Sequence, residues 1–222
     1  MMPNNPTPTI EPMEYLLQKY GMAEPIKVFG AVTQLLPRRN VPIIFLIDEN
    51  HGSVKCIEQN LANAGELVQK AAVTLIGVES RYGGQEWDDS EGSYKRSYDA
   101  GDKLVAANTC TTFADRMSSS AAKVRGVECF GLVGQMECES LPGGSWHGKP
   151  IKDHPLNEIR SEHFVRTVLE LRSSLRLTGN IILNAGGNHN SHIEGWVRDG
   201  TIEAKARQEA AYVRVRAPAY TE

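Results

Sequence analysis

The sequence predicts a single α/β domain with a largely parallel central β-sheet flanked by helices. Residues 41–47 and 73–78 are short apolar runs rich in β-branched residues, as buried strands are, and each ends abruptly in polar residues. Between them, residues 54–71 carry apolar side chains at intervals of three and four, which predicts a helix. A strand-helix-strand unit with a short crossover is right-handed with parallel strands, so both strands are expected to end at one edge of the sheet.

The length and composition of the chain favour one soluble globular domain. Its 222 residues, 41% hydrophobic and 23% charged, suffice for one sizeable core. We assign residues 13–222 to this domain and expect residues 1–12, rich in Pro, Asn and Thr, to be a disordered or loosely packed N-terminal tail. A net charge of −3 without a basic cluster indicates neither nucleic acid nor a membrane surface as a partner.

The cysteines and the N-terminus bear on the cellular compartment. The four cysteines are widely spaced without a C-x-x-C pair, and Cys56 and Cys129 fall inside predicted elements, so free thiols and a reducing compartment are expected. The sequence shows no signal peptide and no apolar run long enough to span a bilayer. We therefore expect a cytoplasmic protein, or one secreted by a route without an N-terminal signal peptide.

The first third of the chain is interpreted from its periodicity. Residues 14–20 are expected to form a short helix. Apolar residues at helical spacing over residues 26–36, ended by Pro37, predict a second helix that leads into the first strand. Ser53 stands where it would cap the helix over residues 54–71.

The middle of the chain alternates between loops and periodic segments. Residues 80–102 have no core pattern and are rich in Gly, Tyr and charge, which is typical of a binding lid or of disorder. Residues 103–122 are expected to be helical in part, residues 124–133 to form a third strand, and residues 136–155 a second long loop. Residues 156–177 have the clearest helical spacing in the chain.

The last third of the chain contains a further strand end. Residues 181–183 begin a strand that runs into Asn, Gly and His residues. Residues 201–211 are expected to be helical. Residues 212–216 alternate apolar and charged side chains, which predicts a half-exposed or edge strand.

The strand ends carry side chains that ionise or form hydrogen bonds. Glu49 and His51 follow the first strand, Glu79 ends the second, and His189 follows the later one. Such groups bind a metal, act as acid and base on a bound water, or recognise a polar ligand, and their spacing does not choose between these roles. Three common motifs are absent, namely the helical H-E-x-x-H zinc site, G-x-S-x-G and the phosphate-binding P-loop.

Further residues are candidates for substrate binding. Asn188 and His192 flank His189, after a Gly-Gly pair that suits either a pocket wall or a tight turn. Arg81 is either an anion anchor or a salt-bridge partner of Glu79. Tyr82 would contribute to an aromatic lid together with other aromatic residues of the same loop, Trp87, Tyr94 and Tyr98.

At these residues the chain resembles the erythromycin esterase/ChaN-like (EreA/ChaN-like) superfamily, which also groups the Tiki/TraB proteases and a domain of a bacterial toxin. Its pattern of a Gly-Glu-x-His-like motif, a strand ending in Glu, and a downstream Gly-x-x-His motif corresponds to residues 48–51, 77–79 and 186–189. The family's Gly before the first Glu is Asp48 here, an extra carboxylate that could add a metal ligand or repel an anionic substrate. The resemblance implies a mostly parallel sheet and a pocket built from Glu49, His51, Glu79 and His189.

The function expected from these residues is hydrolysis of an ester or amide in a small-molecule or peptide substrate. His51, held by Glu49 or Glu79, would deprotonate water, and His189 would stabilise the oxyanion or protonate the leaving group. A metal-assisted version uses Glu49, His51 and His189 as ligands of manganese or zinc. The alternatives are a protein that binds haem or another small ligand through its histidines, and an effector or toxin domain.

Overall fold

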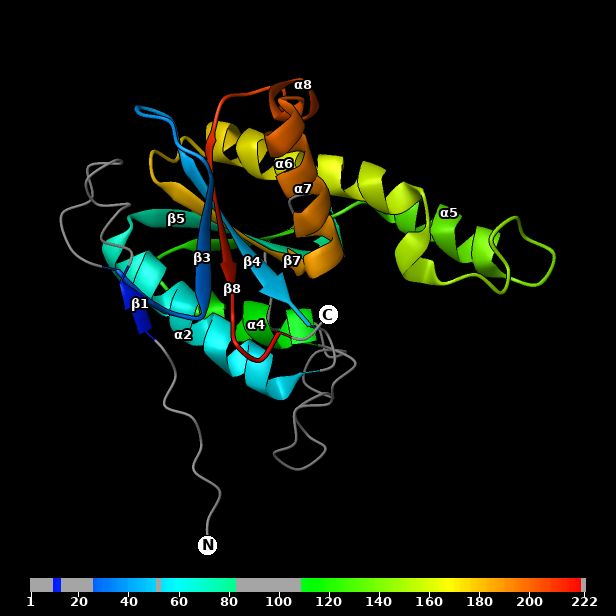
Figure 1. The fold of residues 1–222 in the computed structure, drawn as a ribbon, viewed down its shortest axis with the longest axis horizontal. Helices are drawn as coiled ribbons and strands as arrows, with labels where there is room; N and C mark the ends of the chain where they lie inside the picture. Colours follow the sequence, from blue (N-terminus) through cyan, green and yellow to red (C-terminus); the bar gives the residue numbers. More distant parts are fainter. Residues whose placement is uncertain (1–9, 13–25, 51–52, 83–108, 221–222) are drawn as a thin grey trace, which may run out of the picture.

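The computed structural model describes residues 10–12, 26–50, 53–82 and 109–220, and a six-stranded sheet forms its centre (Figure 1). The sheet strands are β3 (Ala31–Leu36), β4 (Ile43–Glu49), β5 (Val73–Tyr82), β6 (Lys123–Glu128), β7 (Asn180–Gly186) and β8 (Ala211–Arg216). The helices are α2 (Val54–Lys70), α4 (Thr109–Ser118), α5 (Phe130–Ser140), α6 (Leu156–Ser174), α7 (Gly187–Asp199) and α8 (Ile202–Ala206), with a short 3-10 turn η2 (Ile151–Asp153).

The strand order is β3-β8-β4-β7-β5-β6, and neighbouring strands are parallel except for β3 with β8. Two short strands, β1 (Ile10–Pro12) and β2 (Lys27–Phe29), pair separately as an antiparallel ribbon. The general prediction of an α/β fold with a largely parallel sheet is therefore confirmed.

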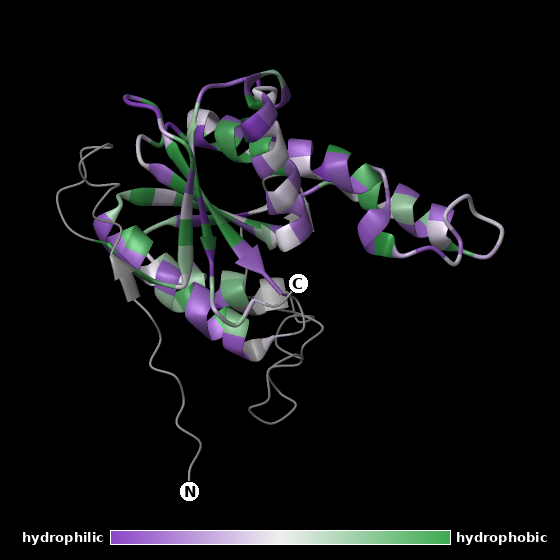
Figure 2. Cartoon of the chain, in the orientation of Figure 1, coloured by the Kyte–Doolittle hydropathy of each residue, from purple (hydrophilic) through white to green (hydrophobic). Residues whose placement is uncertain are grey.

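Helices cover both faces of the sheet and divide the core in two. In Figure 1, α2 and α4 lie on one side of the strands, and α6, α7 and α8 on the other. Because successive strand residues point to opposite faces, Phe45 and Ile47 of β4 join the α2 side, and Ile44 and Leu46 join the α6 side. Figure 2 shows the hydrophobic colour concentrated on the central strands.

The first strand-helix-strand unit forms as predicted. Every residue of β4 is buried, and α2 begins directly after Ser53, whose hydroxyl accepts a hydrogen bond from the backbone N–H of Cys56 at 3.2 Å. The predicted helix over residues 156–177 is also confirmed, as α6.

The helix predicted over residues 26–36 is wrong, because this segment forms β2 and β3. Ile26 and Val28 are buried while Lys27 between them is exposed, which is the two-residue period of a strand. Gly30, with a φ of +101°, then separates the two strands. The same apolar residues fit a helical spacing by coincidence.

The boundaries predicted between residues 124 and 155 are also wrong. The third strand ends at Glu128, and Cys129 is the N-cap of α5, which occupies the start of the predicted loop. Figure 1 shows α5 and the turn after it extending away from the sheet as an arm. This arm leads back through η2 into α6.

The C-terminal strand differs from the prediction in its position. Residues 212–216 belong to β8, which is neither half-exposed nor at an edge, since it lies between β3 and β4 and is almost wholly buried. Its Arg214 is only 5% exposed, because the carboxylate of Asp48 binds it. The preceding helix α8 also ends five residues earlier than the predicted 201–211 segment, at Ala206.

Some predicted segments lie outside the described residues, namely the helix over 14–20, the N-terminal tail except residues 10–12, and positions 83–102 of the long loop. In the part of the chain that is described, Cys56, Cys129 and Cys138 are free thiols, and Cys56 is buried. Among the described helices, none has the length and apolar composition to cross a membrane.

Candidate active site

A pocket opens at the carboxyl ends of the parallel strands. In the sheet register Glu49 of β4 stands opposite Gly186 of β7, and Glu79 lies on the adjacent strand β5. Ligand sites in open α/β sheets form at this edge. The cavity has a volume of about 600 Å³, within the range of small-molecule sites.

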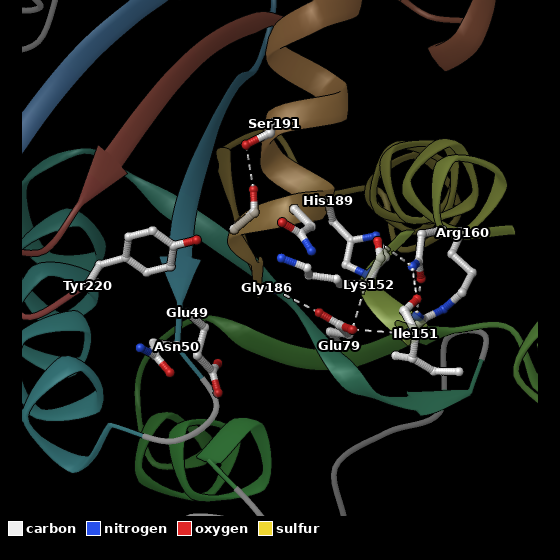
Figure 3. A pocket seen from close by; sticks show the side chains of 13 residues that line it. Glu49, Asn50, Glu79, Ile151, Lys152, Arg160, Gly186, His189, Ser191 and Tyr220 are labelled. Carbon is white, nitrogen blue, oxygen red and sulfur yellow. Dashed lines mark hydrogen bonds and ion pairs between the residues drawn. The ribbon is translucent and has the colours of Figure 1, made fainter. Parts of the chain in front are cut away.

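The residues that line the cavity come from the strand ends, from the start of α7, from η2 and α6, and from the C-terminal segment after β8. They are Glu49, Asn50, Glu79, Ile151, Lys152, Asn157, Arg160, Gly186, Gly187, Asn188, His189, Ser191 and Tyr220. Figure 3 shows Tyr220 at one end of the pocket and Arg160 with Ile151 at the other, with Glu49, Glu79 and His189 between them.

Glu79 is the centre of the hydrogen bonding in the pocket. Its Oε1 lies 3.0 Å from Nη2 of Arg160 and 3.2 Å from Nε2 of His189. Its Oε2 accepts a hydrogen bond of 2.7 Å from the backbone N–H of Gly186. Contacts to N–H groups on three different elements fix the orientation of this carboxylate.

Arg160 of α6 connects Glu79 to the end of β6. Its Nε and Nη2 donate to the two oxygens of Glu128 at 3.0 and 2.5 Å, and its Nη1 donates to Asn157 at 2.9 Å. Burial opposes the charge of Arg160, but the hydrogen bonds and charges of Glu128 and Glu79 outweigh it and raise the pKa of Arg160. The guanidinium therefore stays positive between two carboxylates.

His189 lies on the first turn of α7, at the back of the pocket. It is 4% exposed, and its ring packs at 4.8 Å from the ring of Phe164, measured between centroids. The strand passes into this helix through Gly186 and Gly187. A Cβ at Gly187 would collide with the hydroxyl of Tyr220, so the Gly-Gly pair permits a close approach to the pocket wall.

Asp48 and Glu49 point to opposite faces of the sheet, as successive strand residues do. The amide of Asn184 donates to Glu49, which is 2% exposed and lines the pocket. The Asp48 carboxylate binds Arg214 and Arg216 instead, at 2.7 and 2.8 Å, and is not among the lining residues. Asp48 therefore neither adds a ligand to the pocket nor repels a substrate there.

The rim of the pocket is formed by η2. Ile151 is 51% exposed, and Lys152 beside it is exposed as well. The side-chain amide of Asn157 donates to the backbone oxygens of both residues, at 2.8 and 3.1 Å. The rim is thus attached to the helix that supplies Arg160.

Of the predicted site residues, the structure brings four together in one pocket, namely Glu49, Glu79, Asn188 and His189. His192 does not line the pocket and instead contacts Ser161 behind it. His51, the side chains of Arg81 and Tyr82, and the other aromatic residues of the predicted lid lie outside the described residues.

The predicted metal site can be followed only in part. Glu49 and His189 line the same pocket, while the third predicted ligand, His51, lies outside the described residues. Within the described ranges, no group of three or more His, Cys, Asp or Glu side chains is placed to hold a metal ion.

Sequence reasoning missed the contribution of α6 to the site. Asn157, Arg160 and Ser161 lie between the apolar positions that identify the helix, where polar residues ordinarily face solvent. Glu128 was assigned to the interior of a longer strand, and no element was predicted for the segment after residue 216 that contains Tyr220. The only signal for Glu128 was its position close after an apolar run, as with Glu79.

The comparisons with known proteins give no further assignment. No family model matches the sequence, and no curated protein or solved structure matches it. The class defined by fold and site is therefore an α/β protein with an acid-imidazole pocket at the carboxyl edge of its sheet.

Proposed function

We propose that this pocket is the active site of a hydrolase that activates water to cleave an ester or amide bond. The observation that carries the proposal is the contact of 3.2 Å between Glu79 and His189 in an open cavity that a second buried carboxylate, Glu49, also lines. An oriented imidazole and a separate carboxylate are the groups that transfer protons in hydrolysis.

The proposed reaction balances its protons inside the cavity. Glu49, or His51 two residues further along the chain, takes a proton from a water molecule whose oxygen bonds to the carbonyl carbon. The Nε2–H of His189, which faces Glu79, is shared between that carboxylate and the oxyanion that forms. The bond to the leaving group then breaks, and the proton held by the base passes to the leaving oxygen or nitrogen.

A fold of the EreA/ChaN-like type is part of this proposal. The resemblance rests on residues 48–51, 77–79 and 186–189. The first segment includes the last two residues of β4, the second lies within β5, and the third runs from the end of β7 into α7, with β7 between β4 and β5. This shared edge is the arrangement that the resemblance implies. It supports the family proposal without identifying a substrate.

The metal-assisted version of the proposal has its own measurement. A metal on His189 would have to replace one of its present partners, because Glu79 lies at Nε2 and Ser161 at Nδ1. We therefore derive no step through a metal. Plasma mass spectrometry of the wild type, His51→Ala and His189→Ala would reveal a manganese or zinc site as near-stoichiometric metal that both variants lose.

Small-ligand binding without turnover is the second candidate, and the cavity volume of about 600 Å³ favours it. Haem is the ligand to test first, because His189 lines the cavity and an imidazole is a common ligand of haem iron. A Soret band that appears on haem addition and is lost in His189→Ala would support this candidate.

The hydrolase proposal is tested with a panel of chromogenic esters and amides. We expect Glu49→Gln and His189→Gln each to lower kcat/KM by about 10²-fold or more, the usual contribution of a group that transfers protons. Glu137→Gln and His147→Gln are matched controls, since both side chains are exposed and lie outside the pocket. Full activity in both pocket variants, or no hydrolysis of any compound by the wild type, would contradict the proposal.

A further inference from the structure

Behind the pocket, one serine hydroxyl joins two imidazoles. Ser161 of α6 is fully buried, and its Oγ lies 2.8 Å from Nδ1 of His189 and 2.9 Å from Nδ1 of His192. The two histidines are three residues apart on α7, so they lie on the same face of that helix. The packing of α6 against α7 thus brings all three groups into contact.

The number of protons on each group determines which group donates in each of these hydrogen bonds. Neutral His189 has one ring N–H, and its Nε2 faces the carboxylate of Glu79, which only accepts, so the proton is on Nε2. Its Nδ1 is then an acceptor, and it shares the single proton of the Ser161 hydroxyl with the backbone oxygen of Asn157. The Ser161 oxygen in turn accepts from Nδ1–H of His192.

Two further contacts fit this arrangement. Burial, and then the neighbouring His189, lower the pKa of His192, which keeps that ring neutral. The Ser161 hydroxyl also donates to the backbone oxygen of Asn157 at 2.7 Å, and this bond holds Oγ in place between the two rings.

We propose that Ser161 and His192 are positioning residues that fix the ring orientation and tautomer of His189, so that it presents an N–H to Glu79 and the pocket. The proposal rests on the proposed function, in which His189 donates to the oxyanion. The ring of Phe164 packs against His189 and the ring of Trp196 against His192. These contacts also restrict the orientation of the two imidazoles.

The first test reads the tautomers directly and needs no substrate. Long-range ¹H–¹⁵N NMR of the wild type is expected to show the Nε2–H tautomer for His189 and the Nδ1–H tautomer for His192. Ser161→Ala removes one acceptor of His192 and leaves it the backbone oxygen of Asn157, so the share of the Nδ1–H tautomer should fall towards the Nε2–H form that free histidine prefers. Ser161→Thr keeps the hydroxyl and should restore the wild-type pattern.

A control variant and a second test variant accompany Ser161→Ala in the NMR measurement. Ser173→Ala changes an exposed serine of the same helix and should leave both rings unchanged. His192→Gln is used if Ser161→Ala does not fold, and His189 is then expected to broaden as its ring loses a fixed orientation. A wild-type His192 in the Nε2–H tautomer, or identical His189 and His192 spectra in wild type and Ser161→Ala, would overturn the proposal.

The second test separates positioning from the proposed function. If the pocket hydrolyses a substrate, Ser161→Ala should lower kcat about tenfold to a hundredfold with little change in KM, and Ser161→Thr should recover most of it. If kcat of Ser161→Ala is unchanged although the tautomer shifts, the hydrogen bonds of Ser161 do not contribute to catalysis, and that part of the proposal is overturned. If the tautomer changes in Ser161→Ala but the wild type hydrolyses no substrate, the positioning of His189 is supported and the proposed hydrolase function is overturned.

Discussion

Asp48 illustrates how a buried carboxylate is stabilised in this protein. It is fully buried, and it accepts hydrogen bonds from Arg214, Arg216 and Asn190. Glu194 binds Arg214 from the other side at 2.5 Å, so two carboxylates and two guanidiniums balance. Burial opposes the charge of Arg214, but Asp48 and then Glu194 outweigh it and raise the pKa of Arg214. The cluster attaches α7 to β4 and β8 next to the pocket.

We predict that Asp48→Asn destabilises the fold by about 3 kcal/mol or more, because it removes the buried carboxylate that pairs with both Arg214 and Arg216 and leaves Glu194 alone to balance two guanidiniums. Urea unfolding followed by circular dichroism measures this change. Asp153→Asn is the control, since this aspartate is exposed on η2, and it should change the free energy of unfolding by less than about 0.5 kcal/mol. Equal stability of the two variants would show that the cluster contributes nothing.

Tyr212 gives a prediction for alkaline pH. Burial raises the pKa of its phenol well above the ordinary value, against an opposing effect of Arg38. The folded state therefore retains a proton that the unfolded chain loses above about pH 10, so stability falls as pH rises through that value. Tyr212→Phe should make this fall shallower, as measured by urea unfolding at several pH values from about 7 to 11.

At neutral pH the same variant should cost little. The Tyr212 hydroxyl has no hydrogen-bond partner among the described residues, so its removal is expected to change the free energy of unfolding by no more than about 1 kcal/mol. Burial also raises the pKa of Cys56, and a residual alkaline slope from that thiol should remain. An unchanged slope in Tyr212→Phe would contradict the assignment to Tyr212.

Single residues also explain what the sequence could predict of the site. Glu49, Glu79 and His189 follow apolar strands, so the strand pattern alone identifies them as neighbours. No such pattern identifies Ser161 and Arg160. A polar residue within a helix is expected to face solvent unless its partner from another element is known. Arg214 caused a similar error. Its charge suggested a half-exposed strand, but it is buried because it pairs with Asp48, which is far away in the sequence.

At the scale of elements, the secondary-structure predictions were wrong where the apolar residues fit both the helical and the strand period. Short apolar segments such as residues 26–36 satisfy helical and strand spacing alike, and only pairing with β8 decides. Longer segments leave no such choice, and α2 and α6 were found with their approximate ends. The arm formed by α5 has weak periodicity, because few of its residues pack against the sheet.

The packing of α6 on the sheet depends on a glycine of β5. A Cβ at Gly77 would lie 2.5 Å from Cγ1 of Val168 on α6 and 2.9 Å from Cγ1 of Val127 on β6. We predict that Gly77→Ala destabilises the protein by about 1–3 kcal/mol through overpacking. Thermal unfolding and urea unfolding both measure this effect.

The matched control for that variant lies on α7. Gly195 is exposed within the helix, and a Cβ there meets no atom within 4 Å. Gly195→Ala should therefore stabilise the protein by about 0.5–1 kcal/mol through helix propensity. If Gly77→Ala behaved like Gly195→Ala, α6 would not be packed tightly on β5.

At the scale of the whole molecule, the sheet is completed by the last strand of the chain. β8 lies between β3 and β4, although more than 160 residues separate Asp48 from its partner Arg214. Of the described strands, only β8 pairs with β3 in this sheet. Such non-local pairing cannot form from sequence neighbours, which is why the strand order could not be predicted from local patterns.

We predict that a chain ending at residue 210 does not fold cooperatively, whereas one ending at residue 217 does. The shorter chain lacks the core side chains of Tyr212, Val213 and Val215, and it leaves Asp48 buried without Arg214. It should show no sigmoidal urea transition, and the chain of 217 residues should keep the wild-type m-value, because it exposes nearly the same surface on unfolding. A cooperative transition of the shorter chain at the wild-type midpoint would mean that β8 is dispensable and that the sheet is held by β4, β7, β5 and β6 alone.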